Sequence, residues 1–251
     1  MRRQPTYATS PAYRRITVGR CLAAVIGSVL IIAAQTAFAQ RAPSPQAQAT
    51  AKTFDYYALV LSWSPTYCDE EGDERRDPQC RPRSERPFAF VLHGLWPQFE
   101  RGFPNNCETE QRPFVSNEII DAMLDIMPAR GLIIHQYRKH GTCSGLSPSR
   151  YFGAARKLFE FINVPDMFVR PIAPQFVTIA DVTQAFMDVN PGIRPDMIAV
   201  SCRRDRGNQL REVRICFTPQ GRLRACGENE DQRRLCRAER MFVPPVRYRP
   251  L

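Results

Sequence analysis

Two short stretches of sequence decide the fold: residues 90–98, FVLHGLWPQ, and residues 135–143, HQYRKHGTC. Between them they hold all three histidines of the 251-residue chain, at positions 93, 135 and 140. A lone histidine is more often a structural residue than a catalytic one. Three imidazoles gathered beside Gly, Trp, Lys and Cys favour a functional site.

Three kinds of chemistry fit such a cluster. A zinc site on a helix prefers histidines four residues apart, whereas His135 and His140 are five apart. Nucleophilic catalysis by Cys143 would need a free thiol. Acid–base catalysis needs two imidazoles in opposite protonation states, which histidine supplies near neutral pH, and it also uses the positive charge of Lys139. The cluster therefore favours acid–base catalysis, and we predict no metal and no other cofactor.

The sequence on either side of the cluster predicts strands, then helices, then strands. Short aromatic, aliphatic and β-branched runs are typical of buried strands, and the second is expected to end at His93. Amphipathic runs between them predict helices, with Ser116 and Thr178 as N-caps. This order favours an α+β fold with an antiparallel sheet. The expected strands are 56–62, 88–93, 197–202 and 212–217, with Asn208 in a turn, and the expected helices are 117–127, 147–161 and 178–190.

The beginning of the chain has the three parts of a secretory signal peptide. Residues 1–20 carry five Arg and no acidic residue, residues 21–34 are apolar, and Ala37-Phe38-Ala39 is a small-residue cleavage site. The apolar run of 14 residues is shorter than the roughly 20 that a membrane-spanning helix needs. We predict a signal peptide over 1–39, a flexible lead-in over 40–53 and one catalytic domain over 54–251. The protein is expected to be periplasmic or extracellular, without membrane attachment after cleavage.

The cysteines agree with export. Cleavage after Ala39 would remove Cys21 and leave an even eight, for which disulfides are the expected state in an oxidising compartment. Eight cysteines allow 105 pairings, so counting alone does not choose among them. No CxxC-type pair is present, which disfavours structural zinc. Cleavage would also halve the formal net charge from +10 to +5, and a basic protein favours polyanionic partners.

The two stretches resemble the active-site motifs of the ribonuclease T2 family, HGLWP and HEWxKHGTC. The first motif matches at all five positions, and the second departs only at Gln136 and Tyr137. The resemblance extends over residues 54–236, where Leu61-Ser62-Trp63 is similar to the family's first strand. It implies a disulfide-braced α+β fold with the pairs Cys68–Cys80, Cys107–Cys143, Cys202–Cys236 and Cys216–Cys226.

The resemblance also implies a function. Members of this family are metal-independent endoribonucleases that cleave single-stranded RNA to a 2′,3′-cyclic phosphate and a free 5′-hydroxyl. The ribose 2′-oxygen is the nucleophile, so DNA is not cleaved. The implied roles are a general base for His140, a general acid for His93, and binding of the phosphoryl oxygens for His135 and Lys139.

Three further residues take expected roles from the same resemblance. Gln136 stands where the family has a catalytic Glu and is expected to take that catalytic position with an acceptor oxygen but without the charge, which predicts an active enzyme with an altered pH optimum. Trp96 and Gln98 are expected to bind a nucleobase, while Trp63 is expected in the core. The alternative function is an exported RNA-binding or partner-binding protein of the same fold whose catalysis is impaired by Gln136. In either case a monomer is expected.

Overall fold

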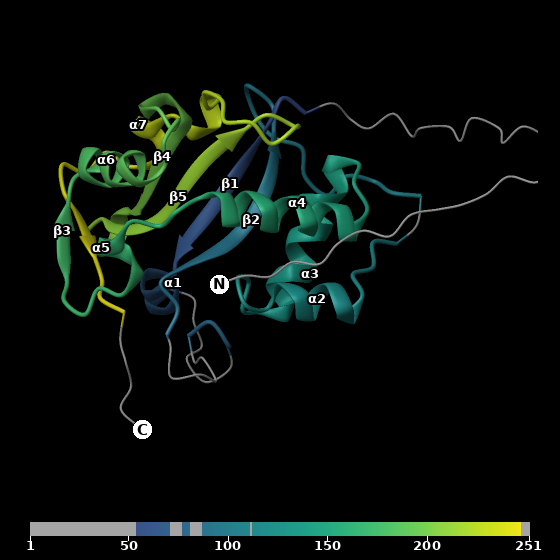
Figure 1. The fold of residues 1–251 in the computed structure, drawn as a ribbon, viewed down its shortest axis with the longest axis horizontal. Coiled ribbons are helices and arrows are strands. Elements are labelled where there is room, and N and C mark those ends of the chain that lie inside the picture. The colour runs from purple at the N-terminus through teal and green to yellow at the C-terminus, as the bar shows by residue number, and fades with distance from the viewer. Residues whose placement is uncertain (1–53, 71–76, 81–86, 111, 247–251) are drawn as a thin grey trace, which may run out of the picture. The chain divides into compact units, whose positions relative to one another are not determined.

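The structure is a computed structural model that describes residues 54–70, 77–80, 87–110 and 112–246 (Figure 1). The predicted signal peptide over 1–39 and lead-in over 40–53 lie outside the described residues. None of the helices in the described ranges is long and apolar enough to cross a membrane.

One mixed sheet organises the described residues. Its strands follow the order β2-β1-β5-β6-β3, and β4 pairs with β5 off this path. All pairings are antiparallel except β5 with β6, which is parallel. The predicted α+β class with a mainly antiparallel sheet is confirmed. The strands are β1 (Tyr56–Trp63), β2 (Phe90–Gln98), β3 (Gln175–Val177), β4 (Ile198–Arg203), β5 (Gln209–Phe217) and β6 (Met241–Val243).

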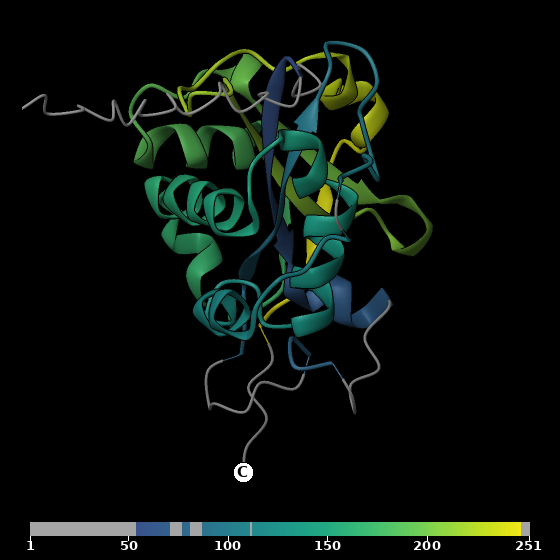
Figure 2. The ribbon, with the colours of Figure 1, turned by 90° about the vertical axis from the view of Figure 1, so that its right-hand side faces the viewer.

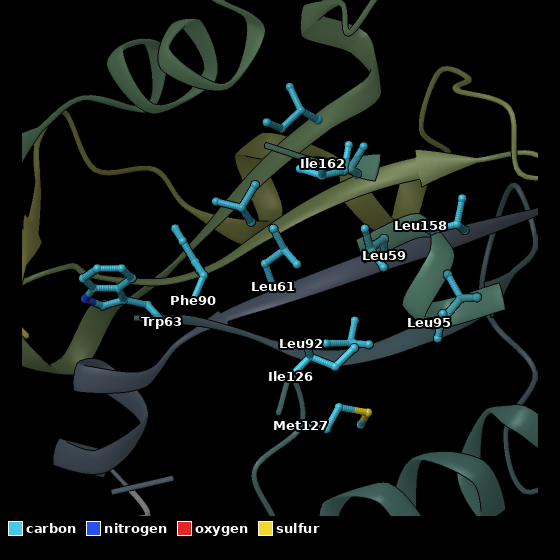
Figure 3. Packing of buried hydrophobic residues seen from close by; sticks show 14 of the residues in the cluster. Leu59, Leu61, Trp63, Phe90, Leu92, Leu95, Ile126, Met127, Leu158 and Ile162 are labelled. Atoms are coloured by element: carbon cyan, nitrogen blue, oxygen red, sulfur yellow. The ribbon is translucent and has the colours of Figure 1, made fainter. Parts of the chain in front are cut away.

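The two faces of the sheet bury different side chains, because successive residues of a strand point to opposite sides. On β1, Leu59, Leu61 and Trp63 enter the main hydrophobic core, whereas Tyr56, Ala58 and Val60 form a small second cluster. Figure 2 shows α4 and α6 on the same side of the sheet, and both contribute to the main core. Figure 3 shows part of that core, where labelled residues include Leu59, Leu61, Trp63, Phe90, Leu92, Leu95, Ile126, Met127, Leu158 and Ile162.

The helices lie mostly between β2 and β4 in the chain, and two of the three predicted ones form as expected. Helix α4 begins after Ser147, whose side chain accepts from the Arg150 amide, and α6 begins with a capping box between Thr178 and Asp181. The helices are α1 (Ser64–Glu70), α2 (Asn117–Met123), α3 (Arg130–Lys139), α4 (Pro148–Phe161), α5 (Asp166–Val169), α6 (Ile179–Val189) and α7 (Gln232–Leu235).

Helix α2 is shorter than predicted, since it ends at Met123 and not at Met127. A turn follows, in which the amides of Ile126 and Met127 both bond to the Met123 carbonyl. This turn frees the Ile126 carbonyl to accept from the Leu92 amide of β2 at 2.9 Å. Ser116 stands at the N-cap position as predicted, but its side chain makes no capping bond.

Strand β2 differs more from the prediction, because it runs from Phe90 to Gln98 and does not end at His93. The pairing of β1 with β2 matches Val60 with Gly94 but Leu61 with Leu92, so His93 is an extra residue in a β-bulge. The bulge shifts the alternation by one residue. As a result Leu92 and Leu95 both enter the main core, while His93 and Trp96 are both partly exposed.

Four disulfides brace the domain: Cys68–Cys80, Cys107–Cys143, Cys202–Cys236 and Cys216–Cys226. They are the four pairs that the family resemblance implies. Asn208 lies in the turn between β4 and β5 with a φ of 55°, as expected for a residue type that tolerates the left-handed region.

Candidate active site

Helix α3 carries the second motif to the β-bulge. Helix α3 and the 3₁₀ turn Gly141–Ser144 that follows it both contact β2. The helix ends at Lys139, and the amide of the C-cap residue His140 donates to the Gln136 carbonyl at 2.9 Å. Just beyond it, Cys143 forms the disulfide to Cys107, and the Asn106 amide bonds to the Lys139 carbonyl at 2.8 Å. The end of α3 is therefore held by the 106–107 segment as well as by its contacts with β2.

Trp96 is the contact point between the two motifs. Its Nε1 donates to Gln136 Oε1 at 2.8 Å. Its ring stacks with His140, with centroids 5.0 Å apart and planes inclined by 19°, and meets His93 edge to face at 5.1 Å. Both predicted acid–base histidines therefore contact one indole ring.

Close packing at two glycines makes this arrangement possible. A Cβ on Gly94 would lie 2.2 Å from Gln136 Oε1 and 2.6 Å from Trp96 Nε1. A Cβ on Gly141 would lie 2.4 Å from the ring of Tyr137. A larger residue at position 94 would therefore displace the side chains that join the two motifs, and one at position 141 would displace the Tyr137 ring.

His93 is held by a buried carboxylate that the sequence analysis missed. Its Nδ1 lies 3.0 Å from Glu212 Oε1, and the Glu212 side chain is only 4% exposed. Burial alone would raise the pKa of Glu212, but the hydrogen bond with His93 and the charges of Arg214 and His93 outweigh it and lower the pKa to about 2. An ionised carboxylate only accepts hydrogen bonds, so Nδ1 of His93 carries a proton, and a second proton can be gained or lost only at Nε2.

Arg214 completes this group. Its Nε and Nη2 donate to Glu212 Oε2 at 3.1 and 2.8 Å, and its guanidinium lies 5.0 Å from the centre of the Trp96 ring. Its Nη1 lies 3.5 Å from Oε1 of Glu230, a buried carboxylate that also accepts from the Tyr56 hydroxyl. Burial raises the pKa of Glu230. Glu212 and Arg214 lie on β5, far from both motifs in sequence, and no local pattern marked them.

The surroundings of His140 differ from those of His93. It is 4% exposed, and its Nδ1 is a buried atom without a hydrogen-bond partner in the described part of the chain. Burial first, then the positive charges of Lys139, His93 and His135, lower its pKa to about 3. His140 is therefore a neutral imidazole at physiological pH, which is the state a general base requires.

The other predicted site residues differ in their exposure to solvent. His135 is exposed on α3 and Lys139 is partly buried, and burial together with the charges of Lys139 and His93 lowers the pKa of His135. Gln136 is buried, and its side-chain oxygen accepts the hydrogen bond from Trp96. Gln98 is 3% exposed and its Oε1 accepts from Asn229 at 2.9 Å.

The predicted nucleobase contacts of Trp96 and Gln98 stay predictions. Trp63 is fully buried in the main core, as expected. Tyr137 is also buried there, and its hydroxyl donates to the Leu146 carbonyl at 3.0 Å. Within the ranges that the structure describes, no group of three or more His, Cys, Asp or Glu could hold a metal ion.

Comparison with known proteins agrees with the motifs. The model of the ribonuclease T2 family matches residues 54–226. A curated relative, a ribonuclease of Aeromonas hydrophila, is 43% identical over 114 residues, which cover 45% of this chain and 48% of that protein, so the match spans about half of its length. Ribonuclease 3 of Arabidopsis thaliana is 30% identical over 189 residues, which cover 67% of this chain and 81% of that protein.

A solved structure shows the same fold. The crystal structure of RNase NT in complex with 5′-AMP aligns with a TM-score of 0.54 at 23% identity, over 77% of this chain and 99% of that chain. At this identity the likeness concerns the fold alone. The sequence motifs, the family match over most of the domain and the shared fold agree, and the chain belongs to the ribonuclease T2 family.

Proposed function

We propose that this protein is a metal-independent endoribonuclease that cleaves single-stranded RNA by transesterification. The observation that carries the proposal is the contrast between two histidines on one indole ring. His140 is buried and neutral, whereas His93 shares a hydrogen bond with an ionised carboxylate. Two titratable groups whose environments differ in this way are suited to the separate tasks of base and acid.

In the proposed reaction, neutral His140 takes the proton of the ribose 2′-hydroxyl while the 2′-oxygen attacks phosphorus. The bond from phosphorus to the 5′-oxygen breaks, and Nε2 of protonated His93 gives its proton to that oxygen. The products are a 2′,3′-cyclic phosphate and a free 5′-hydroxyl, with His140 left protonated and His93 left neutral. Because deoxyribose has no 2′-hydroxyl, DNA is not a substrate.

In this proposal Lys139 supplies positive charge to the reacting phosphate, and His135 binds a phosphoryl oxygen through a ring N–H. They lie in the C-terminal half of α3, four residues apart and hence on one face of the helix. Cations placed where negative charge develops stabilise the transition state. Trp96 and Gln98 are proposed to contact a nucleobase, and Gln136 is proposed to act by fixing Trp96 through its acceptor oxygen.

The test is cleavage of a short RNA by the oxidised protein in excess EDTA, with product ends identified by mass. The expected result is a 2′,3′-cyclic phosphate from RNA, no cleavage of the DNA of the same sequence, and loss of activity in His140→Ala by roughly 10²–10⁴-fold. If the folded protein binds RNA but does not cleave it between pH 4 and 8, the alternative stands, namely an RNA-binding or partner-binding protein of this fold.

We further propose that the protein is exported, is cleaved after Ala39 and works as a monomer in the periplasm or the medium. The support is the three-part pattern of residues 1–39 together with eight cysteines that form four disulfides. N-terminal sequencing of the secreted protein should begin at Gln40, and its mass in solution should equal that of one chain.

A further inference from the structure

We infer that Glu212 is a positioning residue for His93, which holds the imidazole so that Nε2 faces the departing 5′-oxygen, and that Arg214 in turn holds Glu212. This inference rests on the proposed function, because it assigns a task within the proposed acid step.

The hydrogen bonds leave the Glu212 carboxylate little freedom. Oε1 bonds with His93 Nδ1 at 3.0 Å, and Oε2 accepts from Arg214 Nη2 at 2.8 Å and from Nε at 3.1 Å. The two oxygens thus have separate partners, and the side chain is 4% exposed. A carboxylate fixed at both oxygens fixes the plane of the imidazole that bonds with it.

The sheet supplies the rigidity behind this contact. Glu212 lies on β5 and His93 on β2, with β1 hydrogen-bonded between them. Ser62 of β1 pairs with Glu212, and the bulge beside Leu61 turns His93 to the same face. Three adjacent strands therefore set the separation of acid and carboxylate, with no loop in the path.

Arg214 connects Glu212 to the rest of the site. It lies two residues further along β5 and so shares its face. Its guanidinium lies between two buried carboxylates, Glu212 and Glu230, and beside the ring of Trp96. One cation thus fixes the carboxylate behind the acid and also contacts the indole on which both histidines pack.

Folding stability alone does not explain why the charged side chains of Glu212 and Arg214 are buried. A buried ion pair loses much of its attraction to the desolvation of both charges, so it is a weak source of folding free energy. A carboxylate that orients a histidine, in contrast, fixes the tautomer that catalysis needs. With Nδ1 protonated and engaged, the imidazole can gain or lose its second proton only at Nε2.

A pair of substrates separates this role from a structural one. One is a dinucleotide, whose 5′-oxygen must be protonated as it leaves. The other is the matching nucleoside 3′-(4-nitrophenyl phosphate), whose phenolate leaves without a proton. The variants are Glu212→Gln, Glu212→Ala and, as controls, Glu228→Gln, His93→Ala and His140→Ala. Glu228 is an exposed carboxylate paired with Arg101 at 2.7 Å.

Loss of positioning affects only the step that needs the acid. For Glu212→Gln we expect kcat on the dinucleotide to fall about tenfold or more, with KM unchanged and the 4-nitrophenyl ester cleaved within about twofold of the wild-type rate. His93→Ala should show the same selectivity with a larger loss. Glu228→Gln should resemble wild type, and His140→Ala should lose both activities, since both substrates need the base.

Three results would decide against the inference. The first is cleavage of the dinucleotide at the wild-type rate by Glu212→Gln and Glu212→Ala. The second is an equal loss of activity on both substrates in these variants, together with a lower melting temperature. If Glu212→Gln does not fold, Glu212→Asp keeps the charge but shortens the reach, and equal losses on both substrates in that variant also reject the role. An inactive wild-type protein would instead reject the proposed function itself.

Discussion

Trp96 Nε1 donates a 2.8 Å hydrogen bond to Gln136 Oε1, and this bond ties β2 to α3 across 40 residues of sequence. An indole nitrogen can only donate, so residue 136 must supply an acceptor. Glutamine does so without charge. The departure from the family motif therefore preserves the contact and removes a negative charge from the neighbourhood of His140.

The variant Gln136→Glu tests what the missing charge does. The hydrogen bond to Trp96 should persist, while the added carboxylate should stabilise protonated His140 and raise its pKa from about 3. Lys139, His93 and His135 act in the opposite direction and stay in place. We expect the acid limb of the kcat/KM profile to move to higher pH. An unchanged profile would mean that residue 136 does not interact electrostatically with His140.

The variant Gln136→Met tests the hydrogen bond itself. It keeps the volume but removes the acceptor, so the indole N–H of Trp96 is left without its partner. Such a loss costs about 1–3 kcal/mol of unfolding free energy. Urea denaturation measures this value, and the Gln136→Glu protein, which keeps an acceptor, is the matched control.

The low pKa of His140 predicts how stability depends on pH. In an unfolded chain histidine titrates near pH 6.5, but in the folded protein the pKa is about 3. Between these values the unfolded state binds a proton that the folded state does not. The free energy of unfolding should therefore decrease as pH falls from about 6.5, by up to about 1.4 kcal/mol per pH unit.

Replacement of His140 by Phe isolates this contribution. The pKa of His135 is also lowered and adds to the same slope, so the difference between wild type and variant is the quantity to measure. Glu212 affects stability at lower pH than His140 does. Its stabilising contribution is complete above about pH 4.5 and is lost as the pH falls toward 2. A slope between pH 6.5 and 4.5 that is equal in both proteins would contradict a neutral, buried His140.

Gly94→Ala should disrupt the contact between the motifs. The added Cβ would lie within 2.6 Å of both Gln136 Oε1 and Trp96 Nε1, so one of these side chains must move. We expect a loss of about 1–3 kcal/mol in stability and a large loss of RNA cleavage. Gly131→Ala in α3 is the control, because its Cβ would meet nothing within 4 Å and should stabilise the helix by up to about 1 kcal/mol.

The disulfide Cys107–Cys143 should affect both stability and activity. It links residues 36 apart and holds the turn that begins directly after His140. Replacing both cysteines with alanine should cost about 3–4 kcal/mol of stability and lower the rate of cleavage. Replacing Cys68 of α1 and Cys80, which lie 12 residues apart in sequence, should lower stability without the same effect on rate. Equal rates in the two double variants would show that the Cys107–Cys143 bond does not shape the site.

The sequence predicted the site where its residues are contiguous. His93 and Trp96 lie in one stretch and Gln136, Lys139 and His140 in another, and their motifs are specific. The carboxylate at position 212 is 119 residues from His93, and only the strand order β2-β1-β5 brings the two together. A side chain whose role depends on topology leaves no local pattern, so Glu212 and Arg214 were recognised only as part of a strand.

The fold shows the same limit at a smaller scale. The capping box of α6 and the apolar face of α4 are local signals, and both helices were predicted. Helix α3 was not predicted, because the polar Gln136 lies among the apolar residues of its buried face and breaks the hydrophobic pattern. The bulge at His93 was also missed, since strict alternation would have placed His93 and Leu95 on the same side. The early end of α2 depends on a hydrogen bond from β2, which the sequence of the helix does not encode.

The β-bulge at His93 has a consequence for how activity is lost on denaturation. The residue is part of a strand paired with β1, and the same strand contributes Leu92 and Leu95 to the main core. A residue built into a strand that is paired with β1 and packed on the core is not expected to loosen before the sheet does, unlike a residue on a surface loop that opens locally. Inactivation and global unfolding by urea should accordingly follow one cooperative curve. At no urea concentration should the protein be folded but inactive.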